Sequence, residues 1–302
     1  MDELTAADIH DSELRTSYQE CKRLNSLHGK TYYLATLLLP KEKRPHVHAL
    51  YGFARFADEI VDDLSSTLSP EQKTGELERW SQTILRDIKS GRSEDHIGRA
   101  LVNTVRTFEI PLGYFEAFLH SMAMDLTITS YQSFEALHEY VYGSAAVIGL
   151  QMVHVLGTIP GKKDEALIAA EKLGIAFQLA NFIRDVGEDL DRGRIYLPLD
   201  ELESFGVTPE LLNKRTLTPA IIDALKFQIS RVRELQRQAS EGIRFLPPSA
   251  RPCIEAASEL YCGIVDEVEK IDYQVFTKRA KTSTIRRAGV ALPAWLRALA
   301  AR

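Results

Sequence analysis

The chain has 302 residues, of which 26 % are charged and 45 % hydrophobic, a balance typical of a folded globular protein and not of a disordered one. Its 17 glycines and 12 prolines are too few for a linker-rich or collagen-like chain. The net charge of −5 argues against nucleic acid as the main partner, because proteins that bind nucleic acid usually carry a basic surface.

Helical periodicity dominates the chain, and no sustained alternation of β-branched residues indicates a strand. Turn signals such as Leu39-Pro40, Ser69-Pro70 and Pro160-Gly161 separate the helical stretches. In chain order the predicted helices span residues 11–28, 45–64, 70–89, 96–108, 112–127, 134–156, 163–190, 219–245 and 251–271, with a last one near Trp295. No fixed repeat and no long linker interrupts them, so we predict one all-α domain over residues 1–302.

The predicted helix 45–64 carries a narrow polar stripe on an otherwise apolar cylinder. At about 100° per residue, every third or fourth side chain falls on the same line. This line holds Tyr51, Arg55, Asp58 and Asp62, while Phe53 and other apolar residues occupy the remaining faces. A solvated face would be broader, so we expect the stripe to line an internal cavity.

The segment from Tyr140 to Gly161 contains no Lys, Arg, Asp or Glu and is nearly long enough to span a membrane. Its small and polar residues, among them Gly143, Gly149 and Gln151, instead favour a buried helix at the centre of a helical protein.

A second polar stripe runs along the predicted helix 163–190. At the same spacing it holds Gly174, Gln178, Asn181, Asp185 and Asp189. Arg184 stands beside this stripe, and we expect it to pair with Glu188 one turn further on and so to steady the carboxylates.

The two stripes together indicate a metal site. Burying several carboxylates costs several kcal/mol per ion unless a positive charge compensates them. Mg²⁺ prefers oxygen ligands and often joins carboxylates to substrate phosphates, whereas zinc and copper prefer the cysteine and histidine that the stripes lack. A buried network of arginines and aspartates without a metal is the alternative. The predicted ligands are Asp58, Asp62, Asn181, Asp185 and Asp189.

The end of the chain is basic. From Tyr273 onward there is no acid, and the bases are Lys278, Arg279, Lys281, Arg286, Arg287, Arg297 and Arg302. Such a segment is either a solvated helix face or a contact for anionic phosphates, including lipid headgroups. The three cysteines form no CxxC pair, and the first residues contain no apolar signal stretch. We therefore expect a reducing, cytoplasmic location.

At these motifs the chain resembles the squalene/phytoene synthase family of head-to-head prenyl synthases. The resemblance covers almost the whole chain, and the two acidic motifs together are highly specific. The matching motifs are His28-Gly-Lys-Thr-Tyr-Tyr33, Asp58-Glu-Ile-Val-Asp62, Tyr142-Gly143, the run from Gln178 to Asp189, Arg194-Ile-Tyr196 and Tyr261. Within the family the chain is most similar to short bacterial-type phytoene synthases, which lack the C-terminal membrane anchor of squalene synthases.

The resemblance implies a helical bundle of the isoprenoid-synthase type around a central cavity. It also implies the condensation of two geranylgeranyl diphosphates to phytoene through a cyclopropylcarbinyl (prephytoene) diphosphate, a step of carotenoid biosynthesis. Mg²⁺, or Mn²⁺ in its place, would be the cofactor, and NADPH would not be needed because the sequence of steps ends in proton loss. Since substrate and product are lipids, the basic end becomes an expected peripheral contact with the inner face of the plasma membrane.

The resemblance assigns roles to further residues. The residues implied in catalysis are Tyr51, Arg55, Tyr142, Arg184 and Tyr261. Those implied in holding the substrate diphosphate are Lys30, Arg55, Gln178, Arg194 and Arg279.

Two other functions stay open at this point. One is a squalene or dehydrosqualene synthase that acts on farnesyl diphosphate, and the other is a non-catalytic helical interaction protein with the same fold. Ala146 stands where many family members have glycine, and its methyl group is expected to point into the hydrocarbon tunnel. That departure leaves the prenyl chain length undecided.

Overall fold

The computed structural model describes residues 1–62 and 68–301, with the backbone alone for Asp62. Within these ranges the chain is helical and forms no strand, and one isolated β-bridge joins Ser130 to Ile195. The elements are α1 (Glu3–Ala6), α2 (Ser12–His28), α3 (Lys30–Thr36), α4 (Arg44–Asp62), α5 (Pro70–Ser90), α6 (His96–Phe108), α7 (Leu112–Met124), α8 (Phe134–Val141), η1 (Tyr142–Ala146), α9 (Val147–Leu156), α10 (Lys163–Asp191), α11 (Leu199–Ser204), α12 (Pro209–Asn213), α13 (Pro219–Ile243), α14 (Arg251–Cys262), α15 (Ile264–Lys270) and α16 (Thr284–Ala300).

The all-α prediction is confirmed, and the long predicted helices exist with ends that shift by a few residues. The predicted end of helix 45–64 lies outside the described residues. Four short helices, α1, α3, α11 and α12, escaped the sequence analysis because four to seven residues are too few to show a helical period. The predicted helix 251–271 is interrupted at Gly263, which separates α14 from α15.

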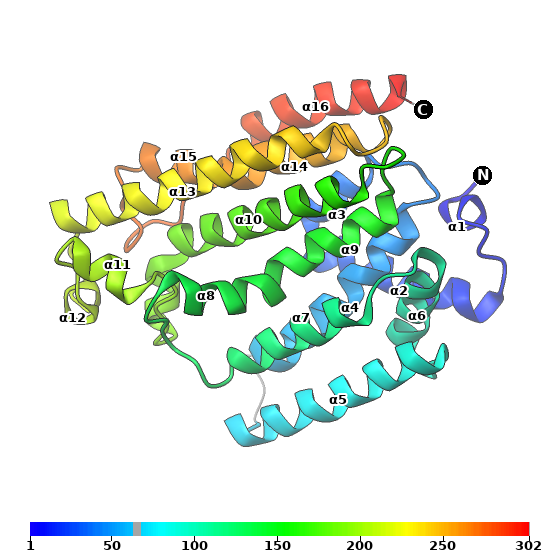
Figure 1. Cartoon of the computed structure of the whole chain (residues 1–302), viewed down its shortest axis with the longest axis horizontal. Coiled ribbons are helices and arrows are strands. Elements are labelled where there is room, and N and C mark those ends of the chain that lie inside the picture. Colours follow the sequence, from blue (N-terminus) through cyan, green and yellow to red (C-terminus); the bar gives the residue numbers. More distant parts are fainter. Residues whose placement is uncertain (63–67, 302) are drawn as a thin grey trace.

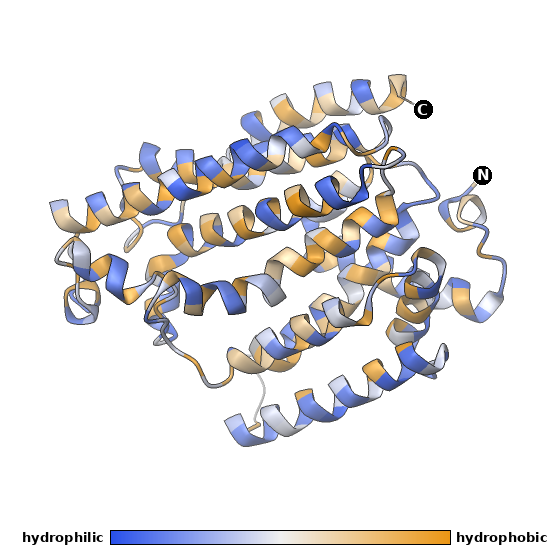
Figure 2. Cartoon of the chain, viewed as in Figure 1, coloured by the Kyte–Doolittle hydropathy of each residue, from blue (hydrophilic) through white to orange (hydrophobic). Residues whose placement is uncertain are grey.

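Helix α10 forms the centre of the molecule. It packs against α13 on one side and against η1 and α9 on the other, as Figure 1 shows. One hydrophobic cluster contains buried residues of α10, α13 and α15, and a second contains buried residues of α4, α5, α6, α7 and α9. In Figure 2 the ribbon of α9 is mostly hydrophobic, whereas α5 at the margin is mostly hydrophilic. The polar stripe of α10 lines the cleft described below and is partly exposed there.

The segment predicted as one buried helix over 134–156 is three helical pieces, with the π-helical turn η1 between α8 and α9. This interruption, together with the burial of Val147, Leu150 and Val153, agrees with a core position and not with a membrane span. Helix α10 is itself long and apolar enough to cross a membrane, the one such helix in the described ranges. However, 56 % of its most apolar stretch is buried in the protein, which marks it as a core helix.

Glycine lets η1 approach α10 closely. A Cβ atom at Gly174 would lie 2.7 Å from the carbonyl oxygen of Ala145 and 2.9 Å from Cα of Ala146, both backbone atoms that cannot rotate away. Only a residue without a side chain fits between these two elements. The same contact holds the cavity wall together, because Gly174 and Ala145 both line the cavity described below.

We expect Gly174→Ala to lower the free energy of unfolding by about 1–3 kcal/mol, since the methyl group forces η1 away from α10. Gly113→Ala in α7 is the matched control, because outside the neighbouring residues and backbone of its own helix no atom lies within 4 Å of the added methyl group. That control should be neutral or stabilising by up to about 1 kcal/mol through the reduced entropy of the unfolded chain. Urea unfolding monitored by circular dichroism compares the two, and equal effects would contradict the close-approach explanation.

Candidate active site

A polar cleft lies between the stripes of α4 and α10. The stripe residues that line it are Tyr51, Arg55, Asp58, Gln178, Asn181, Asp185 and Asp189. The predicted juxtaposition of the two acidic motifs is therefore confirmed for the described side chains. The side chain of Asp62 lies outside them.

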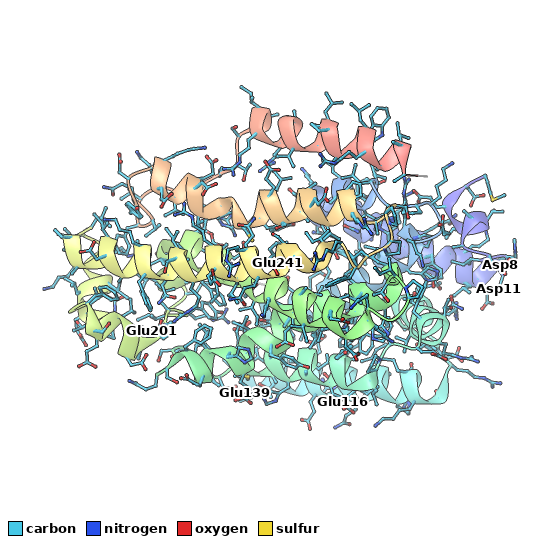
Figure 3. The ribbon with its side chains drawn as sticks, turned by 45° about the horizontal axis from the view of Figure 1, so that its top comes forward. Asp8, Asp11, Glu116, Glu139, Glu201 and Glu241 are labelled. Carbon is cyan, nitrogen blue, oxygen red and sulfur yellow. The ribbon has the colours of Figure 1, made fainter. Side chains whose placement is uncertain are left out.

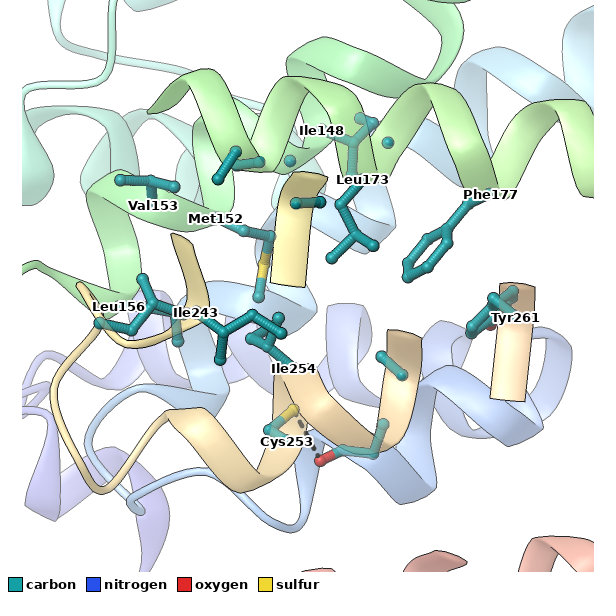
Figure 4. A pocket seen from close by; sticks show the side chains of 18 of the residues that line it. Ile148, Met152, Val153, Leu156, Leu173, Phe177, Ile243, Cys253, Ile254 and Tyr261 are labelled. Carbon is teal, nitrogen blue, oxygen red and sulfur yellow. Dashed lines mark hydrogen bonds between the residues drawn. The ribbon is translucent and has the colours of Figure 1, made fainter. Parts of the chain in front are cut away.

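An apolar cavity continues inward from the cleft. Its walls come from α9, α10, α13 and α14, and Figure 4 shows Met152, Leu173, Phe177 and Ile254 pointing into it. The empty volume is about 1240 Å³ when the open mouth is included. The residues that line both the cleft and the cavity are Tyr32, Ser144, Ile148 and Asn181. A ligand with a polar head and a long hydrocarbon chain fits this combination.

On α4, Arg55 forms ion pairs with the acids of its own helix. Its Nη1 donates to Oδ2 of Asp58 at 2.7 Å, and its Nε donates to Oε1 of Glu59 at 3.1 Å. The side chains of Arg55 and Asp58 are 29 % and 46 % exposed, so both can be reached from the cleft. Arg55 thus neutralises part of the first acidic motif.

On α10, Asp185 accepts hydrogen bonds from two arginines. Arg184 donates from Nε at 2.7 Å, and Arg279 donates from Nε at 2.9 Å. Burial raises the pKa of Asp185, but the two guanidinium groups outweigh it and hold that pKa below its ordinary value. The predicted partner of Arg184 was wrong: Arg184 pairs with Asp185, and Glu188 lies 3.4 Å from Arg279 instead.

Asp189, one turn beyond, has no comparable neutralisation. Burial raises its pKa from 3.8 to about 7, and the charge of Asp185 adds to the rise against the opposing arginines 192 and 194. An ionised Asp189 is therefore costly in the protein without a bound cation. This cost is the electrostatic signature of a position that favours a positively charged ligand.

We expect Asp189→Asn to raise the free energy of unfolding of the metal-free protein by roughly 1–3 kcal/mol at pH 8. A carboxyl group whose pKa is raised by folding lowers stability once the unfolded chain has ionised. The gain should therefore vanish below about pH 3, grow as the pH rises from about 4 to 7, and stay constant above. Urea unfolding in EDTA at several pH values measures it, and a gain independent of pH would contradict this origin.

A basic pocket adjoins the cleft. Its cationic lining consists of Arg184, Arg279, Lys281 and Arg287, and Thr31 and Tyr261 are among its other lining residues. Tyr261 also lines the apolar cavity, where its ring stacks on Phe177 with centroids 4.9 Å apart. An anionic group in this pocket would thus lie beside the hydrocarbon cavity. The sequence analysis found Lys281 and Arg287 as part of the acid-free end but did not place them at the site.

Asp125, at the end of α7, is a site residue that the sequence analysis missed. Its carboxylate accepts hydrogen bonds from the hydroxyls of Tyr140 at 2.7 Å and Tyr196 at 2.8 Å. Its carbonyl oxygen accepts one from Nη2 of Arg194 at 2.9 Å. This network holds Arg194 at the cleft, and it joins segments too distant in the sequence for helical spacing to reveal.

Three predicted residues stand apart from this arrangement. Lys30 is exposed at the start of α3 and does not line the cleft, the cavity or the basic pocket. Tyr142 lines none of them either, and burial together with the charge of Glu171 raises its pKa. Ala146 is fully buried in the core and not at the cavity, so its expected place in the tunnel wall is wrong. The neighbours Ser144 and Ala145 face the cavity instead.

The donor set of the cleft suits a hard divalent cation. Asp58, Asn181, Asp185 and Asp189 supply oxygen atoms only, as Mg²⁺ prefers. Among the described side chains no three acids, histidines or cysteines converge closely enough to hold an ion by themselves. An all-oxygen donor set of this kind suits a cation that also binds a phosphate group, a common arrangement for Mg²⁺.

The fold and the site define a class: all-helical proteins that receive a long apolar chain with an anionic head between two acidic helices. The chain belongs to the squalene/phytoene synthase family, whose sequence model matches residues 26–286. Members of this family use prenyl diphosphates as substrates.

Relatives and solved structures agree with this assignment. The chain is 37 % identical over 297 residues to 15-cis-phytoene synthase of Synechocystis sp., covering 95 % of this chain and 87 % of that protein. It is 38 % identical over 291 residues to the chloroplastic phytoene synthase of Daucus carota, covering 95 % and 72 %. Its structure resembles a dehydrosqualene synthase in complex with ligand, with a TM-score of 0.84, 26 % identity and coverage of 97 % and 98 %. The squalene synthase of Alicyclobacillus acidocaldarius shares the fold, with a TM-score of 0.80, 24 % identity and coverage of 89 % and 98 %.

Proposed function

We propose that the protein is a prenyl transferase that condenses two geranylgeranyl diphosphates head to head into phytoene, a step of carotenoid biosynthesis. The observation that carries this proposal is the similarity over 95 % of the chain to proteins named phytoene synthase. The apolar cavity that opens into a cleft of arginines and aspartates supports it, because it matches a long hydrocarbon with a diphosphate head.

The reaction consumes two diphosphate esters and releases two diphosphates and two protons. The first substrate loses its diphosphate and the double bond of the second attacks the resulting allylic cation, which after proton loss gives the cyclopropylcarbinyl diphosphate. This intermediate then loses its own diphosphate, rearranges and loses a second proton to give phytoene. No reductant enters, so NADPH is not required.

The chain's own residues bind the leaving groups and exclude water. Arg184, Arg279 and Lys281 present guanidinium and ammonium donors to a diphosphate in the basic pocket. Tyr261 lines both this pocket and the cavity and stacks on Phe177 of the cavity wall, and these rings can stabilise a developing cation. The apolar walls keep water from capturing that cation.

We further propose Mg²⁺, or Mn²⁺, as the cofactor. Asp58, Asn181, Asp185 and Asp189 would hold it together with Asp62. Bound there, a divalent ion acts as a Lewis acid that neutralises the departing diphosphate. The raised pKa of Asp189 and the all-oxygen donor set support this part of the proposal.

The deciding experiment is product analysis. With Mg²⁺ and geranylgeranyl diphosphate, and without NADPH, we expect phytoene and diphosphate as products. If geranylgeranyl diphosphate were left unconsumed while farnesyl diphosphate gave squalene with NADPH or dehydrosqualene without it, that result would replace phytoene as the product. Binding of either substrate without any turnover would favour the non-catalytic interaction protein.

We also propose that the protein is cytoplasmic and associates peripherally with the inner face of the plasma membrane. Its lipid substrates and the bases near its end support this location. Three of those bases are engaged within the protein: Arg279 with Asp185, Arg286 with Asp266 and Glu267, and Arg297 with Glu255. In the described part of the chain Lys278, Lys281 and Arg287 take part in no ion pair. Lys281 is assigned above to the substrate diphosphate, so Lys278 and Arg287 are left for lipid phosphates.

These bases predict that binding to membranes depends on the salt concentration. Binding to vesicles that contain phosphatidylglycerol should exceed binding to pure phosphatidylcholine vesicles, and added salt should remove the difference because it screens charges near the surface. Sedimentation with vesicles measures both quantities. Equal binding to the two kinds of vesicle at low salt would remove the proposed role of the bases.

A further inference from the structure

Helix α16 presents its large apolar side chains to the outside of the molecule. Its buried residues are the smaller Val290, Ala294 and Ala298, which face the protein. The exposed ones are Ile285 at 86 %, Leu292 at 61 %, Trp295 at 47 %, Leu296 at 55 % and Leu299 at 45 %. A helix that only covers a core would bury its large apolar side chains and expose its small ones, because the burial of large side chains supplies most of the stabilisation.

The exposed side chains form one continuous stripe. At about 100° per residue, all five fall within an arc of roughly 100° that lies opposite the buried Ala294. Eleven large hydrophobic side chains are exposed in the described part of the chain, and five of them are on this one helix. Figure 2 shows hydrophobic segments recurring along α16 although the helix lies at the margin of the molecule. Such a concentration marks a contact surface.

The charged residues of α16 itself are all basic, and the acids next to the helix, Glu255, Asp266 and Glu267, are paired with its arginines. No acid follows Asp272 in the sequence, Arg287 belongs to the first turn of α16, and Lys281 comes just before the helix. The acids labelled in Figure 3 belong to other elements and lie away from α16. Arg286 points inward instead, where it donates to Glu267 at 2.7 Å and to Asp266 at 2.8 Å and so fastens α16 to α15.

We propose that the outer face of α16 inserts into the interfacial region of an anionic lipid bilayer. A helix with a strong apolar stripe and basic neighbours suits such a surface, and Trp295 in the stripe suits the level of the headgroups. A second copy of the chain is a poorer fit. A stripe about 25 Å long and 10 Å wide covers a few hundred Å², short of the roughly 800 Å² per partner of a stable interface.

The position of α16 ties this surface to the cavity. Helix α16 packs on α14, and Cys253, Ile254 and Ala257 of α14 line the apolar cavity. Docking through α16 therefore places one wall of the cavity next to the bilayer, where hydrophobic substrates and products dissolve. The inference deepens the membrane association proposed above. The bases contribute the electrostatic part of the binding to the bilayer, which salt weakens, and the apolar stripe contributes the hydrophobic part, which resists salt.

The test combines a stripe variant with a matched control. The triple variant Leu292→Gln, Trp295→Gln, Leu296→Gln removes the stripe, and Ile168→Gln with Phe227→Gln removes exposed apolar groups from α10 and α13. At high salt, we expect the stripe variant to lose at least about tenfold in binding to mixed phosphatidylglycerol–phosphatidylcholine vesicles, and the control to bind like the parent. Both should turn over detergent-dispersed substrate at the parental rate.

A second measurement does not depend on the folding of the variant. The chain has two tryptophans, so the emission of the parent minus that of Trp295→Phe reports Trp295. With vesicles this difference spectrum should shift to shorter wavelength and be quenched by brominated lipid. Unchanged binding of the stripe variant, or an unshifted Trp295, overturns the proposal. A lipid-free dimer that the stripe variant disperses would assign the face to a second copy. Vesicle binding without phytoene formation would defeat the proposed function and leave this inference standing.

Discussion

Asp185→Asn is expected to lower phytoene formation by about 10³-fold or more. Asp185 lies in the cleft, holds Arg184 and Arg279 by hydrogen bonds, and belongs to the proposed donor set. An amide keeps the shape but removes the negative charge, so both the cation and the arginines lose their partner. Diphosphate release and phytoene extraction measure the rate. EDTA should abolish the activity of the parent reversibly.

Asp191→Asn is the matched control for this change. Asp191 ends the same helix, but its side chain is 64 % exposed and pairs with Arg215 away from the cleft, so activity should be retained. Full activity of the parent in EDTA, or of both Asp58→Ala and Asp185→Ala, would contradict the metal-dependent mechanism.

The stability of the Asp185→Asn variant distinguishes the stabilising ion pairs of Asp185 from the destabilising burial of Asp189. Because folding lowers the pKa of Asp185, its charge stabilises the protein at neutral pH, and this contribution disappears as the pH falls through that lowered pKa. Asp185→Asn should therefore be no more stable than the parent at pH 7, whereas Asp189→Asn should be more stable. The relief of repulsion expected from like charges belongs to Asp189 and not to Asp185.

Ala257→Phe should reduce turnover of geranylgeranyl diphosphate by about 100-fold or more, because a misplaced substrate loses the geometry of reaction. Ala257 lies on the cavity wall between Ile254 and Tyr261, one turn from each. The added ring occupies space that the prenyl chain needs, while the protein without substrate has room for it and should stay folded. Steady-state kinetics and thermal unfolding measure the two expectations.

Ala136→Phe in α8 adds the same ring on the surface, where residue 136 is exposed and lines no part of the site, and it should leave turnover unchanged. Parental turnover by Ala257→Phe would show that the substrate chain does not use this cavity. A fall in both variants would point to a general loss of folding and not to blocked binding.

Much of the site could be read from helical spacing. The residues of one helix face are fixed by the 3.6-residue turn, so Tyr51, Arg55 and Asp58 had to share a stripe, and so did Asn181 and Asp185. The other faces of each helix are apolar and pack against the core. The polar stripe therefore has to face a polar cleft or cavity inside the protein. That two such stripes meet at one cleft followed from the same reasoning and from the family resemblance.

The tertiary structure alone decided the contacts between segments distant in the sequence. Spacing proposed Glu188 for Arg184, but the approach of Arg279 and the local geometry of Asp185 decide the pairing. Asp125 joins the site only because α7 ends beside Arg194. Ala146 is buried in the core, while Ser144 and Ala145 of the same π-helical turn line the cavity. The sequence did not reveal the exposed apolar stripe of α16 for a related reason. Periodicity locates an apolar face, but only the packing of α14 on the small residues shows which face stays uncovered.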